Sequence, residues 1–139
     1  MMIATEKTPE RDPALEECTM NQLPSSITLC EVGLRDGLQN EKTLLPTQEK
    51  VALLRGLIEA GFSVIEVGSF MHPKAVPQMA DTDEVYRAVG EVPGVELRAL
   101  IPNLRGVQRA AACGCKKVKL NVSASRQHNL KNLNMTPEE

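Results

Sequence analysis

Strand-like and helix-like segments alternate along this chain with a repeat of roughly 30 residues. Runs of β-branched and other apolar residues predict strands at about 26–32, 62–67, 95–101 and 117–122. Apolar residues at helical spacing lie in the intervals between these strands. Because a strand, a helix and a second strand in that order give parallel strands with the helix packed outside, we predict an α/β fold with about four parallel strands.

Three helices are predicted from their caps and their apolar faces. Thr47, Asp81 and Asn103 have side chains suited to the N-cap position, and the glutamate three residues after Asp81 resembles a capping box. The first helix ends at Gly61, which supplies a left-handed residue, and the third ends at Gly114. We expect each helix to pack on the sheet through one apolar face, in chain order Val51, Leu54, Leu57 and Ile58; Val85, Ala88 and Val89; Leu104, Val107, Ala110 and Ala111.

The segment Gly33–Gly37 follows the first predicted strand and contains an Arg-Asp pair. Ionisable residues just past the carboxyl end of a strand are where parallel α/β folds place their chemistry. Arg35 offers a planar cation, Asp36 offers an oxygen ligand, and the flanking glycines allow a tight turn. The alternative is a β-hairpin in which Arg35 and Asp36 form a solvated ion pair, since Asp-Gly also favours hairpins. The helical pattern after Pro46 favours strand, loop and helix.

Composition excludes several classes of function. Aromatic residues make up only 2% of the chain, so the core must be aliphatic, and the stacking platforms of single-stranded nucleic-acid binders are missing. A net charge of −2 gives no electrostatic reason to expect nucleic acid or a membrane surface as a partner. No apolar run approaches the roughly 20 residues that span a bilayer. With no recognisable secretory or transit signal, the cytoplasm is the default location.

The cysteines do not indicate a disulfide framework. Cys113 and Cys115 form a C-x-C pair with no second pair to complete a zinc site, so we interpret them as small buried residues near a helix end. The other two cysteines are Cys18 and Cys30.

The two ends of the chain carry different signals. Residues 1–24 show no periodicity and are expected to be a disordered extension, which leaves 25–139 as the folded domain. The fourth strand runs into a polar loop at 123–134, and 136–139 then have the signature of a helix start. Four strands cannot close an eight-stranded barrel of about 250 residues, so we expect a truncated barrel domain. A complete four-stranded open sheet is the alternative.

At Gly33–Glu41 the sequence resembles the hydroxymethylglutaryl-CoA lyases, a branch of the metal-dependent lyases and aldol-type synthases built on TIM barrels. The likeness continues through residues 60–70, 73–79, 102–104 and 123–125, and covers about Ile27 to the end. That range corresponds to the first half of the family. The resemblance therefore implies the N-terminal half of a (β/α)8 TIM barrel.

The resemblance also implies a reaction and residues that carry it. In that family a 3-hydroxy-3-methylglutaryl thioester is cleaved to acetoacetate and acetyl-CoA, a step of leucine degradation and ketone-body metabolism. Asp36 matches the aspartate that binds the divalent metal, Mg²⁺ or Mn²⁺. Arg35 matches the arginine that holds the substrate and stabilises the enolate, and Glu66 matches the glutamate that positions it. Weaker candidates for the substrate pocket are Gln39, Ser69 and Ser125.

Physical chemistry supports these roles independently. Cleavage leaves negative charge on the thioester oxygen, which a fixed cation stabilises. Oxygen ligands suit a hard divalent ion, and Arg35 stays protonated, so it can act as a clamp but not as the base. The alternative for Glu66 is an inward barrel residue that merely neutralises Arg35.

The sequence also departs from the family. The family's other metal ligands, a His-x-His pair and an asparagine, and its catalytic cysteine lie on later segments that are not in this sequence. His72 and His128 are isolated and are interpreted as solvated side chains. Lys119 and Asn121 make the fourth strand more polar than a usual barrel interior, which leaves the acyl substrate open.

Three functions remain in competition. The first is the lyase, with an acyl-CoA as its small-molecule partner. The second is a synthase on the same barrel, which condenses acetyl-CoA with a 2-oxo acid. The third is a non-catalytic fragment that self-associates through its exposed strand edges, and for this chain alone we expect weak or absent activity.

Overall fold

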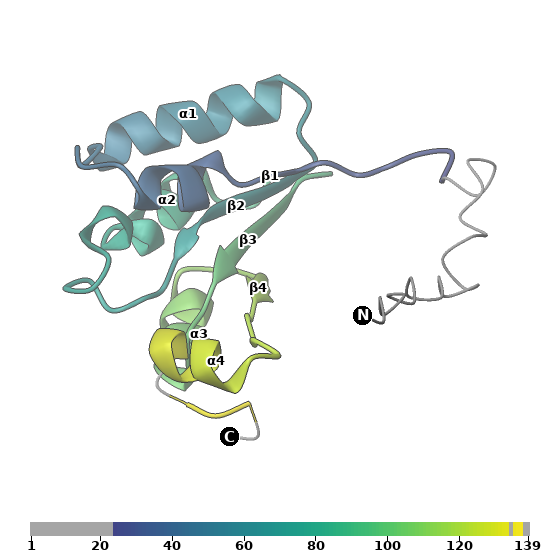
Figure 1. The fold of residues 1–139 in the computed structure, drawn as a ribbon. Coiled ribbons are helices and arrows are strands. Elements are labelled where there is room, and N and C mark those ends of the chain that lie inside the picture. Colours follow the sequence, from purple (N-terminus) through teal and green to yellow (C-terminus); the bar gives the residue numbers. More distant parts are fainter. Residues whose placement is uncertain (1–23, 134, 138–139) are drawn as a thin grey trace, which may run out of the picture.

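The computed structural model describes residues 24–133 and 135–137. These residues form a parallel sheet of four strands in the order β1-β2-β3-β4 (Figure 1). The hairpin alternative is wrong, because the first strand pairs in parallel with the second. The prediction of four parallel strands is confirmed by β1 (Cys30–Glu31), β2 (Val64–Ser69), β3 (Glu96–Leu100) and β4 (Lys117–Lys119).

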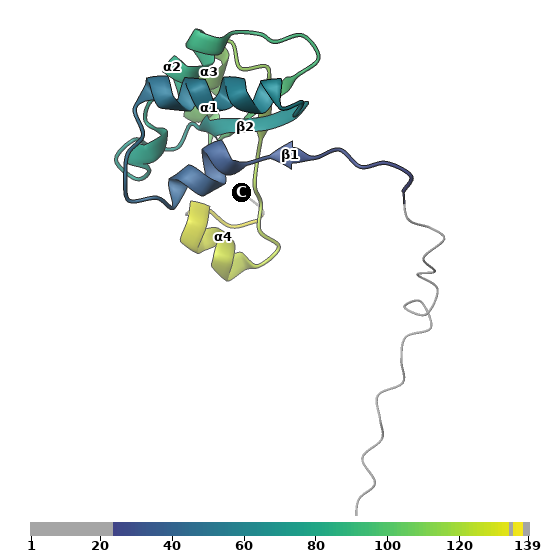
Figure 2. The same ribbon diagram turned by 90° about the horizontal axis from the view of Figure 1, so that it is seen from above.

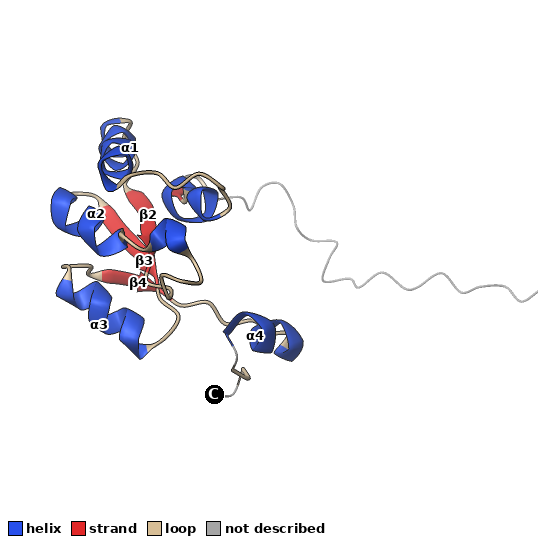
Figure 3. Cartoon of the chain, turned by 90° about the vertical axis from the view of Figure 1, so that its left-hand side faces the viewer, coloured by secondary structure: helices blue, strands red, loops and turns tan. Residues whose placement is uncertain are grey.

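Helices follow the strands as the alternation predicts. The helices α1, α2 and α3 lie along one face of the sheet (Figure 3), whereas α4 lies on the other side of β2 from α1 (Figure 2). A π-helix (Gly33–Gly37) follows β1, and a short 3-10 helix (Pro77–Met79) precedes α2. The bounds of the longer helices are α1 (Thr47–Glu59), α2 (Thr82–Val89), α3 (Leu104–Ala112) and α4 (Arg126–Leu133).

The core lies between the sheet and the first three helices. Ile65 of β2 and Ala99 of β3 are completely buried. They belong to one apolar cluster with Leu54 of α1, Val85 of α2 and Ala110 of α3. The core is mainly aliphatic, as expected from the composition, but it also contains Phe70 and Tyr86. It covers one face of the sheet and leaves the opposite face for polar residues.

Gly68 lets α2 lie close against β2. A Cβ atom at this position would lie 2.5 Å from Oγ1 of Thr82, the first residue of α2. Thr82 is itself buried, and its hydroxyl donates a hydrogen bond to the carbonyl oxygen of Met79 at 2.9 Å. A side chain at residue 68 would therefore force the helix away from the sheet.

The predicted helix caps are partly correct. The side chain of Asn103 accepts a hydrogen bond from the backbone N–H of Gly106 at 3.1 Å, as predicted. Asp81 is the N-cap residue of α2, as predicted, but its side chain makes no capping hydrogen bond. Thr47 was wrong as a cap, because it is the first residue of α1 and Pro46 is the N-cap. Instead, the Thr47 hydroxyl donates to Oδ2 of Asp81 at 2.7 Å, and the buried Lys50 ammonium donates to Oδ1 at 2.5 Å. The Asp81 carboxylate therefore joins α1 to α2 rather than capping its own helix.

The predicted C-terminal ends of α1 and α3 are confirmed, but the buried faces of α2 and α3 differ from the prediction. Gly61 and Gly114 have φ angles of 93° and 86°, the left-handed conformation. On α3, Leu104 is 71% exposed, because small residues let the helix pack on its other face. The residues predicted to be buried that are exposed are Ala88, Leu104, Val107 and Ala111, and the buried residues of α2 and α3 that were missed are Thr82, Tyr86 and Gly106.

The region after β4 differs most from the prediction. The sequence predicts a polar loop at 123–134, but α4 occupies most of it. Ser125 begins this helix: its carbonyl oxygen accepts from the backbone N–H of Asn129 at 2.9 Å, and its Oγ accepts from the backbone N–H of His128 at 3.3 Å. The helix escaped prediction because its polar sequence has no apolar stripe. β1 and β4 are also shorter than predicted, since each pairs with only one strand among the described residues.

Some predictions concern residues outside the described part of the chain. These are most of the expected N-terminal extension, Cys18, Asn134 and the last two residues of the expected helix start. Of the described cysteines, Cys113 is buried and Cys115 is half-buried. None of the described helices combines the length and the apolar character needed to cross a membrane.

Candidate active site

The predicted Arg-Asp pair lies on the π-helix at the carboxyl end of β1. The backbone N–H groups of Arg35 and Asp36 donate to the carbonyl oxygen of Val32 at 3.1 and 2.7 Å, which turns the chain immediately after the strand. The backbone N–H of Gly33 donates to Oε1 of Glu31, the last residue of β1, at 2.5 Å. Both functional side chains therefore emerge at the end of the sheet where parallel α/β folds carry their sites.

A buried carboxylate on the neighbouring strand holds Arg35. Glu66 of β2 is 2% exposed. Its Oε2 accepts from Nε of Arg35 at 2.8 Å and lies 2.7 Å from Nη2. Nη1 of Arg35 donates to Oδ1 of Asp36 at 2.6 Å. The structure thus brings together Arg35, Asp36 and Glu66, the residues to which the sequence assigns the chemistry.

The second oxygen of Glu66 binds a lysine. Nζ of Lys119, on β4, lies 2.8 Å from Oε1 of Glu66. Burial raises the pKa of Glu66, but the hydrogen bonds and positive charges of Lys119 and Arg35 outweigh burial and hold this pKa below its ordinary value. Glu66 is therefore an anion between two cations.

A cavity of about 490 Å³ opens beside Arg35 at the carboxyl ends of the strands. Arg35 is itself nearly buried, so its guanidinium is shielded from bulk water. Apolar residues of β3 and of the loops after β2, β3 and β4 line the opening together with polar ones. The polar side chains that line it with Arg35 are Gln39, Asn121, Ser123, His128 and Asn129.

A family model described as HMGL-like matches residues 26–139. The chain belongs to the HMGL-like family. The resemblance seen in the sequence is therefore confirmed over the whole of the predicted domain.

Relatives of this HMGL-like chain are named hydroxymethylglutaryl-CoA lyases. It is 46% identical over 126 residues to the mitochondrial hydroxymethylglutaryl-CoA lyase of Macaca fascicularis, covering 91% of this chain and 39% of the relative. It is 44% identical over 128 residues to the cytoplasmic 3-hydroxy-3-methylglutaryl-CoA lyase of Rattus norvegicus, covering 92% of this chain and 37% of the relative. The chain therefore spans well under half the length of these relatives.

Solved structures confirm the fold. The hydroxymethylglutaryl-CoA lyase from Pseudomonas aeruginosa matches with a TM-score of 0.79 and 44% identity, over 84% of this chain and 39% of that one. An HMG-CoA lyase from Acinetobacter baumannii in complex with coenzyme A and 3-methylmalate matches with a TM-score of 0.75 and 43% identity, over 78% and 36%. The four strands and their helices thus correspond to part of a TIM barrel, as predicted.

The weaker candidates of the HMGL-like chain fall in different places. Gln39 lines the cavity, and its Oε1 is buried without a hydrogen-bond partner among the described residues. The Oγ of Ser69 is likewise buried and unpaired there, at the end of β2. Ser125 is exposed at the start of α4 and is not among the cavity-lining residues. Gln39 is thus beside Arg35, whereas Ser125 has a structural contact instead.

Sequence reasoning missed the contribution of the segment after β4. Asn129 is buried, with its side chain accepting from the N–H of Ser123 at 2.9 Å and donating to the carbonyl oxygen of Met135 at 3.1 Å. His128, interpreted from the sequence as solvated, is exposed but borders the cavity, with Nδ1 2.5 Å from Oγ of Ser123. The run of polar residues after β4 was the available sequence signal. It did not identify the helix, because such a run is compatible with a loop as well as with a polar helix that lines a site.

The donor set of the HMGL-like chain suits one ligand of a divalent metal. Asp36 has a side chain that is 59% exposed, and its carboxylate is a hard oxygen donor of the kind that Mg²⁺ and Mn²⁺ prefer. A single carboxylate does not enclose an ion, and among the described residues no three His, Cys, Asp or Glu side chains converge. Asp36 can thus contribute to a metal site but cannot form one with its described neighbours.

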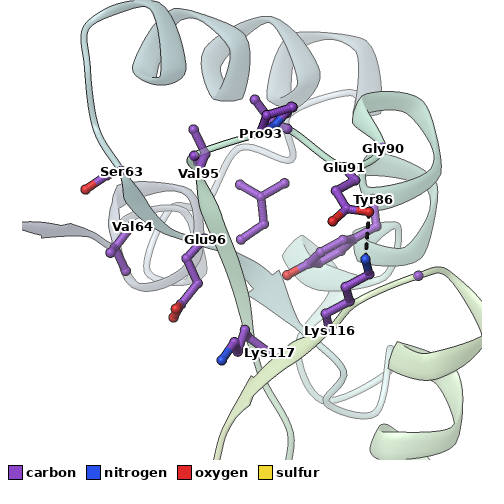
Figure 4. Close-up of a pocket in the computed structure, with 14 residues that line it drawn as sticks. Ser63, Val64, Tyr86, Gly90, Glu91, Pro93, Val95, Glu96, Lys116 and Lys117 are labelled. Carbon is purple, nitrogen blue, oxygen red and sulfur yellow. Dashed lines mark hydrogen bonds and ion pairs between the residues drawn. The ribbon is translucent and has the colours of Figure 1, made fainter.

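A second cavity of about 490 Å³ lies at the opposite, amino end of the strands (Figure 4). It is bordered by Val64 and Glu96, the first residues of β2 and β3, and by an exposed ion pair in which Lys116 lies 2.6 Å from Glu91. Arg35, Asp36 and Glu66 do not line this cavity, and Arg35 lines the one at the carboxyl end of the strands instead.

Proposed function

We propose that this chain carries part of the active site of a carbon-carbon lyase that cleaves 3-hydroxy-3-methylglutaryl-CoA, or a close 3-hydroxyacyl-CoA, to acetyl-CoA and acetoacetate. The observation that carries the proposal is the Arg35 guanidinium, fixed by a buried carboxylate and facing Asp36 beside a cavity. The relatives named as lyases support this reaction over the condensing synthase. The acyl-CoA partner is supported by the A. baumannii structure that contains coenzyme A.

Arg35 acts in this proposal as a fixed positive charge. Breaking the carbon-carbon bond sends its electron pair onto the thioester, whose oxygen becomes negative. Since Glu66 already orients the guanidinium, little reorganisation is needed when this charge develops. A guanidinium does not lose its proton at working pH, so Arg35 stabilises the product enolate and another group removes the hydroxyl proton.

Asp36 supplies one ligand of Mg²⁺ or Mn²⁺, and Gln39, Ser69 and Ser125 remain candidates for substrate contacts. A divalent ion bound there would add positive charge next to the hydroxyl and carboxylate oxygens of the substrate. The relatives carry both mitochondrial and cytoplasmic names, so the cytoplasmic location stays a prediction.

The test is an assay of acetyl-CoA release from 3-hydroxy-3-methylglutaryl-CoA with Mg²⁺ or Mn²⁺, by a protein in which this chain is extended to the length of its relatives. Because the chain spans 39% of a relative such as the macaque enzyme, we expect weak or absent turnover from the chain by itself. In the extended protein, Arg35→Met and Asp36→Asn should each abolish turnover, whereas Arg55→Met, on the exposed side of α1, should not. Failure of the extended protein to cleave any 3-hydroxyacyl thioester would refute the proposal.

A further inference from the structure

Lys119 reaches the candidate site from a strand that does not adjoin β2. β3 lies between them, with Ser69 opposite Leu100 and Leu100 opposite Lys119 in the register of the sheet (Figure 1). The lysine side chain extends across β3 and places Nζ 2.8 Å from Oε1 of Glu66. It is 39% exposed, whereas Glu66 is almost completely buried, so the lysine supplies charge from the open side of the group.

The two oxygens of Glu66 are divided between two cations. Oε1 accepts from Lys119, and Oε2 accepts from the Nε side of Arg35. A guanidinium that meets a carboxylate through Nε and Nη2 keeps Nη1 for another partner. In Arg35 this partner is Asp36, which Nη1 binds at 2.6 Å.

Removing the lysine would leave Oε1 buried without a partner. A buried carboxylate oxygen without a hydrogen bond is unfavourable, and the nearby donor that can satisfy it is the guanidinium of Arg35. In a two-oxygen pairing through Nε and Nη2, the guanidinium would shift along the carboxylate until each nitrogen faced its own oxygen, and this shift would move Nη1 relative to Oδ1 of Asp36. The position of Nη1 against Asp36 therefore depends on whether the second oxygen of Glu66 already has a partner.

We propose that Lys119 is a positioning residue that occupies one oxygen of Glu66 and so keeps the guanidinium of Arg35 directed at Asp36. Its importance for catalysis rests on the proposed function of Arg35 and Asp36, but the contact itself does not. The group also gains a positive charge, so Arg35, Lys119, Glu66 and Asp36 together are neutral rather than negative.

The experiment follows Arg35 and Asp36 directly by NMR of the whole chain without substrate. In Lys119→Met, the Nε–Hε resonance of Arg35 and the side-chain carboxyl ¹³C resonance of Asp36 should both shift. In Lys119→Arg, which keeps a cation, both should stay close to the wild-type positions. Lys117→Met, on the same strand, is the matched control and should leave both unchanged.

A double-mutant comparison tests whether Lys119 acts on Arg35 and Asp36 through the carboxylate of Glu66. Glu66→Gln should shift both resonances, and adding Lys119→Met to it should produce no further shift at Asp36. Unchanged resonances in Lys119→Met would overturn the proposal. So would unfolding of Lys119→Met while Lys119→Arg and Lys117→Met fold, since that would show a role in stability instead. The readout needs no turnover, so a failed lyase assay would refute the proposed function without touching this result.

Discussion

Arg35 and Glu66 are 31 residues apart in the sequence and meet in a buried ion pair, with Nη2 of the arginine 2.7 Å from Oε2 of the glutamate. The pairing of β1 with β2 brings them together at the carboxyl end of the sheet. The contact fixes the guanidinium, which faces both Asp36 and the cavity. It also makes the stability of the fold depend on the residues proposed for chemistry.

Replacing Glu66 should destabilise the protein strongly. In Glu66→Gln the buried guanidinium of Arg35 loses its main counterion, and breaking such a pair costs about 3 kcal/mol. Urea denaturation of both proteins at neutral pH measures the difference. Glu91→Gln is the matched control, because its ion pair with Lys116 is exposed and contributes about 0.5 kcal/mol or less. Equal losses in the two variants would contradict the account.

The free energy of unfolding of the chain should depend on pH through the ionisation of Glu66. Its folded pKa lies below the unfolded value, so its contribution is fully present above the ordinary pKa of a glutamate and is lost as pH falls through the folded pKa. The urea midpoint of the wild type should therefore fall more than that of Glu66→Gln between pH 7 and about pH 3. Parallel declines would show that Glu66 is not paired as described.

Adding a methyl group at Gly68 should disturb the contact between β2 and α2. The Cβ atom of Gly68→Ala would lie 2.5 Å from Oγ1 of Thr82, so we expect a loss of about 1–3 kcal/mol in the free energy of unfolding. Gly56→Ala on α1 is the control, since its Cβ atom would meet no atom within 4 Å. That change should stabilise the helix by up to about 1 kcal/mol. Thermal denaturation of both variants provides the comparison, and a neutral result for Gly68→Ala would be unexpected.

The chain should self-associate in solution. β4 is the outer strand of the described sheet, and Leu120 and Val122 just beyond it are exposed. Sedimentation velocity across a range of concentrations should reveal species larger than a monomer. Leu120→Lys, which places a charge beside the edge, should shift the distribution toward monomer. A single monomeric species for the wild type at all concentrations would contradict this expectation.

The sequence predicted the parts of the fold that depend on local pattern. The apolar run of β2 marked a strand that is buried along its whole length, and Asn103 was recognisable because capping needs only neighbouring backbone. The role of the Asp81 carboxylate was wrongly predicted, because it accepts hydrogen bonds from Thr47 and Lys50 on another helix. Such a contact between helices cannot be predicted from the local sequence pattern. The polar helix α4 was missed because it buries little apolar surface, so its sequence shows no apolar stripe at helical spacing.

The candidate site was predictable as a set of residues but not as a geometry. Arg35, Asp36 and Glu66 were named from motif and resemblance, and they do converge. Lys119 was noticed only as an unusually polar strand residue. Its contact with Glu66 depends on the register of β3 with β4 and on a side chain that crosses a strand, neither of which the sequence alone specifies.

The most direct test of the central claim is an NMR titration of the chain with 3-hydroxy-3-methylglutaryl-CoA in the presence of Mg²⁺. The account predicts that the thioester perturbs the Arg35 Nε–Hε and Gln39 side-chain amide resonances at the carboxyl end of the sheet. It predicts no change at Gly90 and Gly94, which line the cavity at the amino end (Figure 4). Perturbation of those glycines, with Arg35 and Gln39 unmoved, would contradict it.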